Sequence, residues 1–265
     1  MKVVVLGATG TIGSLLVERL HSASHEVVPV SRSTGVDAVT GEGLDRAVAG
    51  ADAVVDCLNI ETLSTLKAVE FFTTTAGNVS AAARRAGVQR VVCVSIAGVS
   101  DPAVAGGYGY YRGKAAQERA YRSAGLPLTI IQSTQWFELV EDIVRRTALG
   151  PVALVPTMRM APVAADSVAR LVVADLLEQS LGQADGTREL TIRGPETATA
   201  AQIARRILEV RGSIAGKRPR AIGELPLMGR AIATGGLIPE DGIVDDVTLE
   251  QWLSLATGST TREDG

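Results

Sequence analysis

Three residues of types that can move a proton, Ser95, Tyr110 and Lys114, lie near one another in the sequence. Tyr110 and Lys114 are four residues apart at the start of a predicted helix, so their side chains share one face. A phenol with a pKa of about 10 is a poor acid or base at neutral pH, and a nearby ammonium lowers that pKa. Ser95 ends a predicted strand and can hold a substrate oxygen, although a strand-end serine can also simply bond to the backbone. Together the three residues predict acid–base chemistry.

A glycine-rich segment follows the first predicted strand and opens the first predicted helix. It reads Gly7-Ala8-Thr9-Gly10-Thr11-Ile12-Gly13. Glycines let backbone N–H groups approach a pyrophosphate, and a helix N-terminus favours the anion. The alternative is a plain glycine turn. The strand before it and the helix after it favour dinucleotide binding, with the binding residues Gly7, Thr9, Gly10, Thr11, Ile12 and Gly13.

Ser31, Arg32 and Ser33 follow the second predicted strand, where an NAD-selective site usually has an acidic residue for the ribose 2′-hydroxyl. The first acidic residue after this strand is Asp37. Arg32 offers a planar set of donors that suits a 2′-phosphate, although it can also be an ordinary surface arginine. We therefore expect NADP(H) as the cofactor, with NAD(H) disfavoured, and we expect Lys114 to hydrogen-bond the ribose beside the nicotinamide.

Short apolar runs alternate with helical patterns over the first 135 residues. Strands are predicted at 3–6, 27–30, 36–40, 53–58, 91–95 and 128–131, and helices at 12–21, 44–48, 63–86 and 111–123. Strands without polar alternation, separated by helices, predict an α/β fold with a parallel sheet covered on both faces. Pro29 lies inside the second strand, expected to be central, where proline removes a ladder donor, so we expect a local irregularity there.

The pattern becomes less regular after Gln135. Strands are predicted at 152–155 and 189–192, and helices at 168–178, 200–210 and 251–255. Residues 214–246 show no clear periodicity. Residues 258–265 are expected to form a frayed tail.

The composition argues against several classes of function. The chain has 265 residues, of which 46% are hydrophobic, and its formal net charge is −3, which disfavours disorder. It has no basic excess and only 3% aromatic residues, so we expect no nucleic-acid partner.

No apolar run reaches the length of a membrane span or a signal segment, so we expect no membrane partner and a cytoplasmic location. Cys57 and Cys93 are expected to be buried reduced thiols. His21 and His25 lack partners at ligand spacing, so we expect no metal.

Four segments carry a resemblance to a known family. They are Gly-Ala-Thr-Gly-Thr-Ile-Gly at 7–13, Val-Ser-Ile-Ala-Gly at 94–98, Tyr-Tyr-Arg-Gly-Lys-Ala-Ala-Gln-Glu at 110–118 and Gln-Ser-Thr-Gln-Trp-Phe at 132–137. With them the sequence resembles the short-chain dehydrogenase/reductase superfamily, and within it the atypical, NmrA-like NAD(P)H-binding branch. The resemblance covers the first 140 residues well and 162–166 more loosely. It implies a Rossmann-type doubly wound parallel sheet of about seven strands with a small C-terminal substrate lobe, and Ser95, Tyr110 and Lys114 as the catalytic set.

The resemblance also bears on the remaining candidate residues and on the domain boundary. It implies that Asn59 lies beside the adenosine ribose and that Ser133 lies near the nicotinamide carboxamide. We expect an NAD(P)-binding domain over residues 1–155 and a substrate-binding lobe over 156–265, interwoven with the first. Four large side chains either line an apolar pocket over the nicotinamide or belong to the core: Trp136, Phe137, Met158 and Met160.

These observations predict an NADP(H)-dependent oxidoreductase that acts on a small carbonyl, enone or quinone substrate. Hydride would pass between C4 of the nicotinamide and a substrate carbon, with Tyr110 exchanging the proton. One alternative is a non-catalytic NAD(P)H redox sensor of the NmrA type, whose mark is loss of the tyrosine or lysine. The other is an isomerase related to sugar-nucleotide epimerases, whose mark is an acidic residue after the second strand. Neither mark is present. We expect a monomer or a homodimer.

Overall fold

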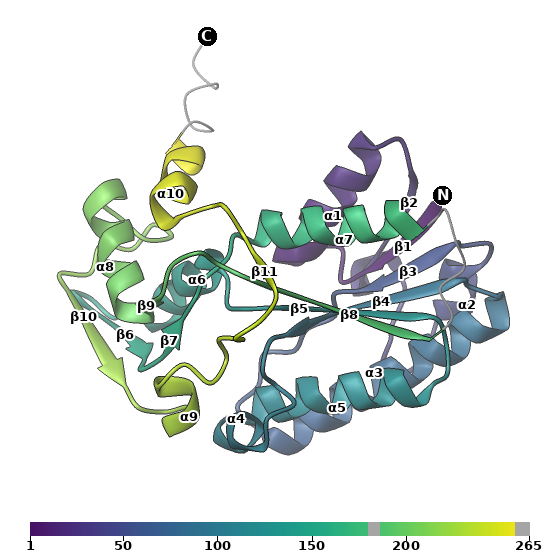
Figure 1. Cartoon of the computed structure of the whole chain (residues 1–265), viewed down its shortest axis with the longest axis horizontal. Coiled ribbons are helices and arrows are strands. Elements are labelled where there is room, and N and C mark those ends of the chain that lie inside the picture. The colour runs from purple at the N-terminus through teal and green to yellow at the C-terminus, as the bar shows by residue number, and fades with distance from the viewer. Residues whose placement is uncertain (180–185, 258–265) are drawn as a thin grey trace, which may run out of the picture.

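Seven parallel strands form the central sheet of the computed structural model, which describes residues 1–179 and 186–257. The predicted tail at 258–265 lies outside the described residues. The strand order is β11-β8-β5-β4-β3-β1-β2 (Figure 1). The bounds are β1 (Lys2–Leu6), β2 (Glu26–Val30), β3 (Ala53–Asp56), β4 (Arg90–Ile96), β5 (Leu128–Ser133), β8 (Thr187–Arg193) and β11 (Ile243–Val244). The prediction of a seven-stranded, Rossmann-type parallel sheet is confirmed.

Helices cover both faces of this sheet (Figure 1). On one face lie α1 (Thr11–Ser22) and α7 (Ala165–Gln179), and on the other α2 (Leu44–Val48), α3 (Thr65–Ala86) and α5 (Gly109–Ser123). Successive strand residues point to opposite faces, so Val5 packs in the cluster that contains Leu16 of α1, whereas Val4 packs with Val79 of α3. Burial on both faces explains why the strands show no polar alternation.

The predicted strand at 36–40 is wrong. The segment forms a turn in which the only pairing described is an isolated bridge between Asp37 and Glu42. The Asp37 carboxylate accepts hydrogen bonds from the backbone N–H groups of Val39 (2.7 Å) and Thr40 (3.3 Å). The Asn78 side chain donates to the carbonyls on the same turn, that of Val39 at 2.8 Å. These local polar contacts satisfy the backbone groups that a strand would have paired.

The irregularity expected at Pro29 is also wrong, and for a related reason. Without a strand at 36–40, β2 becomes an edge strand, and it is continuous from Glu26 to Val30. The N–H of Glu26 donates to the carbonyl of Met1, and Pro29 lies opposite Val5. Because N–H direction alternates along a strand, the missing N–H at residue 29 lies on the outer side, where no ladder bond is lost.

A smaller lobe follows β5, and its core cluster also includes Tyr111 and Ala115 of α5. It contains α6 (Phe137–Thr147), β6 (Val152–Pro156), β7 (Arg159–Met160), β9 (Ala198–Thr199), α8 (Ala200–Arg211), β10 (Ala221–Leu225), α9 (Arg230–Ala233) and α10 (Leu249–Thr257). Figure 1 shows this lobe beside the sheet, with α4 (Pro102–Gly107) below the sheet near the start of α5. β6 pairs with β10, and β7 pairs with β9.

The chain passes between sheet and lobe several times. It leaves the sheet after β5, returns for α7 and β8, leaves for β9 to α9, returns for β11 and leaves again for α10. All of β6 except Pro156 lies within the predicted first domain, yet β6 pairs with β10 of the lobe. The domain boundary at residue 155 stays a prediction.

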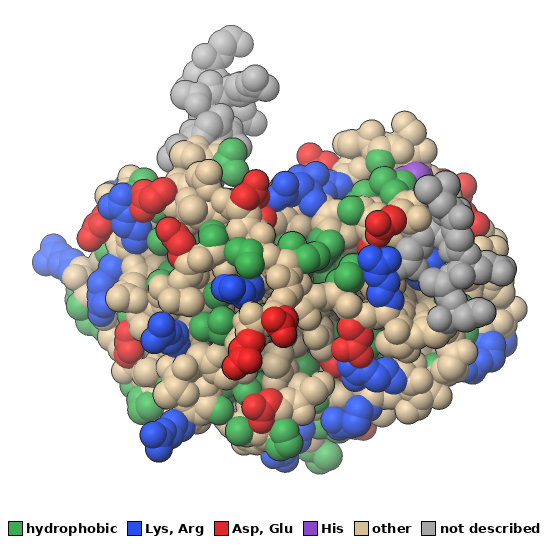
Figure 2. Space-filling model, in the orientation of Figure 1, with side chains coloured by type: hydrophobic (Ala, Val, Ile, Leu, Met, Phe, Trp, Pro, Cys, Tyr) green, Lys and Arg blue, Asp and Glu red, His purple; other side chains and the backbone are tan. Residues whose placement is uncertain are grey.

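The described residues contain no helix long and apolar enough to span a membrane. On the face shown in Figure 2, basic and acidic side chains are interspersed over the sheet domain and the lobe alike. Within residues 1–179 and 186–257 there is no group of three or more His, Cys, Asp or Glu side chains that could hold a metal ion.

Candidate active site

A cavity of about 660 Å³ lies where the carboxyl ends of the strands meet the lobe. The first turn of α1 contributes Gly10, Thr11 and Ile12 to its wall. The lobe side of the wall is largely apolar. Between the two lie the predicted site residues Ser95, Tyr110, Lys114, Ser133 and Asn59. The fold therefore brings residues from five separate segments to one cavity.

The glycines of the β1–α1 loop have different structural roles. Gly7 has a φ of +75°, and a Cβ on it would lie 2.7 Å from the Cys57 carbonyl oxygen. A Cβ on Gly13 would lie 2.1 Å from the Gly7 oxygen. Gly10, by contrast, is exposed in the cavity wall, and its nearest obstacle is the same Gly7 oxygen at 3.3 Å. Gly7 and Gly13 therefore let the loop fold, while Gly10 keeps the cavity open.

The N-terminus of α1 fits a pyrophosphate. Gly10 is the N-cap and provides no side-chain hydrogen bond, and the first turn has no acidic residue. The first N–H groups of this helix therefore lack a side-chain acceptor, and the helix dipole adds a favourable field for an anion. This arrangement suits the diphosphate of a dinucleotide.

Ser31, Arg32 and Ser33 lie beside this loop, because the N–H groups of Gly7 and Ala8 both donate to the carbonyl of Val30. Arg32 is exposed in a short 3-10 helix, η1 (Arg32–Thr34). The hydroxyls of Ser31 and Ser33 are 2.7 Å apart. The nearest following carboxylate, that of Asp37, is already bonded to the backbone of its own turn. None of the three residues lines the cavity itself.

Lys114 is buried and held from two directions. Its ammonium donates to the Val94 carbonyl (2.8 Å) and to the Gln117 side-chain oxygen, and it lies 4.9 Å from the centroid of the Phe72 ring. The Gln117 amide in turn donates to the buried carboxylate of Asp56 at 2.8 Å. Gln117 and Asp56 are therefore positioning residues for Lys114. Sequence reasoning missed both, although Gln117 is three residues after Lys114 and so shares its helix face.

Tyr110 lies in an aromatic cluster with Tyr108, Tyr111 and Phe72. Burial raises the pKa of the Tyr110 phenol above its usual value, and the neighbouring Tyr108 raises it further by a smaller amount. The expectation that Lys114 lowers this pKa is wrong, because the ammonium is directed toward Val94 and Gln117. Tyr110 is therefore a protonated phenol at neutral pH.

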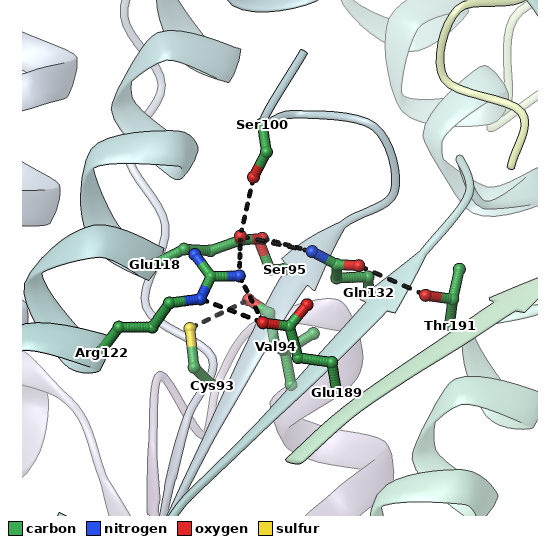
Figure 3. Close-up of polar contacts among 9 residues, drawn as sticks. All are labelled: Cys93, Val94, Ser95, Ser100, Glu118, Arg122, Gln132, Glu189 and Thr191. Carbon is green, nitrogen blue, oxygen red and sulfur yellow. Dashed lines mark hydrogen bonds and ion pairs between the residues drawn. The ribbon is translucent and has the colours of Figure 1, made fainter. Parts of the chain in front are cut away.

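The Ser95 hydroxyl donates to a side chain that the sequence analysis did not single out. Its partner is Glu118, at 2.5 Å (Figure 3). The Glu118 side chain is fully buried, and three further side chains donate to it: Ser100, Arg122 and Gln132. Arg122 also bonds to Glu189. Because the Ser95 O–H donates its hydrogen bond to Glu118, the Ser95 oxygen can only accept a hydrogen bond from a group in the cavity.

Replacing Glu118 by Ala should lower the free energy of unfolding by about 3 kcal/mol, because it leaves the buried donors around it without an acceptor. Urea denaturation measures this. Glu178→Ala is the control, since that carboxylate is exposed and its pair with Arg188 is of the surface kind, worth about 0–1 kcal/mol. Equal losses in the two variants would contradict a structural role for the Glu118 network.

The other candidates are placed as follows. Asn59 is exposed in the cavity wall, and its side-chain oxygen accepts from the N–H of Ile60 (2.9 Å). The Ser133 hydroxyl accepts from the Trp136 indole at 3.0 Å. Trp136 and Met158 line the cavity, and Met158, Phe137 and Met160 are also residues of the lobe core cluster. Cys93 is buried as expected, but Cys57 is partly exposed and forms part of the cavity wall.

The fold and the cavity define a class of protein, the dinucleotide-binding Rossmann proteins. A model of an NAD(P)H-binding family matches residues 7–180. The chain belongs to this NAD(P)H-binding family, in agreement with the resemblance to the atypical short-chain dehydrogenase/reductase branch. A search of curated proteins found no match.

Many solved structures share the fold. A dTDP-4-dehydrorhamnose reductase from Bacillus anthracis, in complex with NADP, is similar with a TM-score of 0.73 and 14% identity, over 97% of this chain and 99% of that one. The Citrobacter sp. triphenylmethane reductase, complexed with NADP(H), has a TM-score of 0.67 and 16% identity, over 97% and 100%. A UDP-glucose 4-epimerase from Bifidobacterium longum, with NAD+ and UDP, has a TM-score of 0.73 and 12% identity, over 99% of each chain. At these identities the likeness shows the fold.

Proposed function

We propose that the protein is an NADP(H)-dependent oxidoreductase that reduces a small carbonyl, enone or quinone substrate. The observation that supports this most directly is that the candidate residues share one cavity. The N-terminus of α1, which has no side-chain cap, lies in the wall of this cavity together with Tyr110 and Lys114. The part of the wall that the lobe contributes is largely apolar. Such a wall suits a small apolar substrate. The isomerase alternative is disfavoured by the lack of an acidic residue directly after β2, where Ser31, Arg32 and Ser33 stand instead.

The residues of the chain have separable roles in this reaction. The bound nicotinamide supplies the hydride. The first-turn N–H groups of α1 bind the diphosphate, and Lys114, which uses two of its three N–H donors within the protein, directs the third to a ribose hydroxyl. Tyr110 donates its phenolic proton to the substrate oxygen as the substrate carbon receives hydride, and water then returns a proton to Tyr110.

Ser95 is not free to donate a hydrogen bond to a substrate carbonyl, because its hydroxyl already donates to Glu118. While its proton is bonded to Glu118, its oxygen can only accept, for example from the Tyr110 hydroxyl or from a substrate O–H. Donation to a substrate carbonyl requires rotation of the hydroxyl away from Glu118.

NADPH should bind more tightly than NADH by about 1–3 kcal/mol, the value of charge-assisted contacts from Arg32 to the 2′-phosphate. Arg32→Asp should erase or reverse this preference, because a carboxylate repels the phosphate and can accept from a 2′-hydroxyl. Fluorescence titration with both reduced cofactors measures it. Arg218→Asp makes the same charge change at an exposed site in the lobe and should keep the preference. Equal affinities in the wild-type protein would refute the assignment of Arg32.

A non-catalytic redox sensor differs from an enzyme in one measurable way. Both bind NADPH, but only the enzyme oxidises it when a substrate is supplied. The assay follows NADPH absorbance in the presence of a panel of ketones, enones and quinones. Turnover of any member that depends on Tyr110 supports the oxidoreductase, and NADPH binding without turnover of any member favours the sensor.

A further inference from the structure

The segment 57–63, between β3 and α3, lines the cavity along its whole length and is neither helix nor strand. It is held at both ends. The N–H of Leu58 donates to the buried carboxylate of Asp56 at 2.8 Å, and the hydroxyl of Ser64 caps the N-terminus of α3. Between these ends, the side chain of Glu61 connects the segment to α6 of the lobe.

The connection is an ion pair. A carboxylate oxygen of Glu61 lies 3.0 Å from a guanidinium nitrogen of Arg146. Asp142, one turn earlier on α6, also pairs with Arg146, so the guanidinium is held toward the segment by its own helix. Burial raises the pKa of Tyr108 in the cavity wall, and Arg146 opposes this effect, which places the positive charge near the cavity.

The ion pair lies where the cavity meets solvent. Both residues line the cavity, yet the side chain of Glu61 is 67% exposed and that of Arg146 is 40% exposed. Leu63, two residues after Glu61, also lines the cavity and is exposed. Since Glu61 comes from the sheet domain and Arg146 from the lobe, the pair connects the two parts at the mouth of the cavity.

Other contacts between the two parts are much closer. A Cβ on Gly98 would lie 2.6 Å from the oxygen of Gly236, and a Cβ on Gly107 would lie 2.4 Å from the oxygen of Met228. Backbones that approach this closely cannot separate without loss of packing. An exposed ion pair, in contrast, breaks and re-forms at low cost. The mouth is therefore the place where the lobe and the segment 57–63 can part.

We propose that Glu61 and Arg146 form a latch across the mouth of the cavity, which opens whenever a cofactor enters or leaves. The latch joins two parts of the protein and is assigned no contact with a ligand. Breaking it therefore raises the open fraction, and with it the rates of entry and exit alike, while the equilibrium affinity stays the same. The inference goes beyond the proposed function, because it needs cofactor binding in this cavity and no particular reaction.

Stopped-flow fluorescence with NADPH measures both rate constants in the wild type, Glu61→Gln and Arg146→Gln. In each variant, association and dissociation should be about three- to fivefold faster, where fivefold corresponds to about 1 kcal/mol, the upper value for an exposed pair. The dissociation constant should stay unchanged. The double variant should exchange NADPH as fast as either single variant, because each change breaks the same contact.

Arg145→Gln is the matched control. Arg145 is the neighbour of Arg146 on α6, is exposed and also pairs with Asp142, but it does not line the cavity. Its exchange rates should equal those of the wild type. Salt gives a second check, since screening weakens the latch in the wild type only. The ratio of the Glu61→Gln rates to the wild-type rates should approach one at about 1 M salt.

Four results would overturn the latch. They are unchanged rates in Glu61→Gln, a changed dissociation constant, which would show that the residue contacts the ligand, additive effects in the double variant, and equal effects of Arg145→Gln and Arg146→Gln. If the wild type binds NADH in preference to NADPH, the proposed cofactor is wrong, but the same measurements with NADH test the latch. A wild-type protein that binds neither cofactor would overturn both proposals.

Discussion

Tyr110→Phe is expected to lower turnover by about 10²–10⁴-fold, the usual contribution of general acid–base catalysis. The change removes one hydroxyl and keeps the ring that packs edge-to-face on Phe72, with centroids 5.7 Å apart. NADPH affinity and the melting temperature should therefore stay near the wild-type values. The measurement is NADPH oxidation with whichever ketone, enone or quinone the wild-type protein reduces best.

Tyr108→Phe is the matched control, because Tyr108 belongs to the same aromatic cluster and also lines the cavity. Burial raises its pKa as well. We assign no proton transfer to it, so turnover should stay within a few-fold of wild type. If Tyr110→Phe kept the full rate, the proton would come from elsewhere, and the protein would reduce its substrate without a dedicated tyrosine donor.

The raised pKa of Tyr110 also predicts the pH profile. Reduction needs the protonated phenol, which persists below the pKa and is lost only as the pH rises through it. The reduction rate should therefore show no loss through Tyr110 up to a pH of about 10, the ordinary value for a phenol. Oxidation of an alcohol needs the phenolate, so its rate should keep rising across the same range. A reduction rate that falls already near pH 7 would contradict the raised pKa.

Gly10→Val should weaken NADPH binding on the order of 10³-fold. A branched side chain at this exposed position would occupy the space in front of the first-turn N–H groups, and the loss of two or more charge-assisted hydrogen bonds amounts to about 4 kcal/mol. The fold should survive, because the nearest obstacle to a Cβ is one oxygen at 3.3 Å. Fluorescence titration and circular dichroism measure the two effects.

Gly13→Ala provides the contrast within the same loop. Its Cβ would lie 2.1 Å from the Gly7 oxygen, so the backbone must shift and the melting temperature should fall. Gly10→Val should instead lose ligand binding at a nearly unchanged melting temperature. Normal NADPH binding by Gly10→Val would show that the loop has only a structural role.

The elements that we propose to bind the dinucleotide could be predicted because each has a local signal. The run of apolar residues in β1, the glycines and the first turn of α1 are adjacent in the sequence, so their order alone defines the motif. The segment 36–40 has an apolar content that resembles a strand. Whether it forms one depends on Asn78, 40 residues from Ala38, which donates to the turn instead.

The contacts of the site side chains were beyond the reach of sequence patterns. Helical spacing places Tyr110 and Lys114 on one face, but it does not show that the Lys114 ammonium would bond to Val94 and Gln117. Likewise, Ser95 was recognised from its place at a strand end, whereas its partner Glu118 is identified only by packing α5 against β4.

The order of strands in the central sheet constrains how the chain is made. β5 pairs with β8, and the roughly 60 residues from the end of one to the end of the other include all of α6, β6, β7 and α7. At a synthesis rate of about 5–20 residues per second, one edge of β5 stays without its partner for about 3–12 s on the ribosome. During that time it is an open strand edge with unpaired backbone N–H and C=O groups. A chain released before residue 193 would keep this edge exposed and should be prone to aggregation, so we expect the sheet to be complete only after most of α6 to α7 has been synthesised.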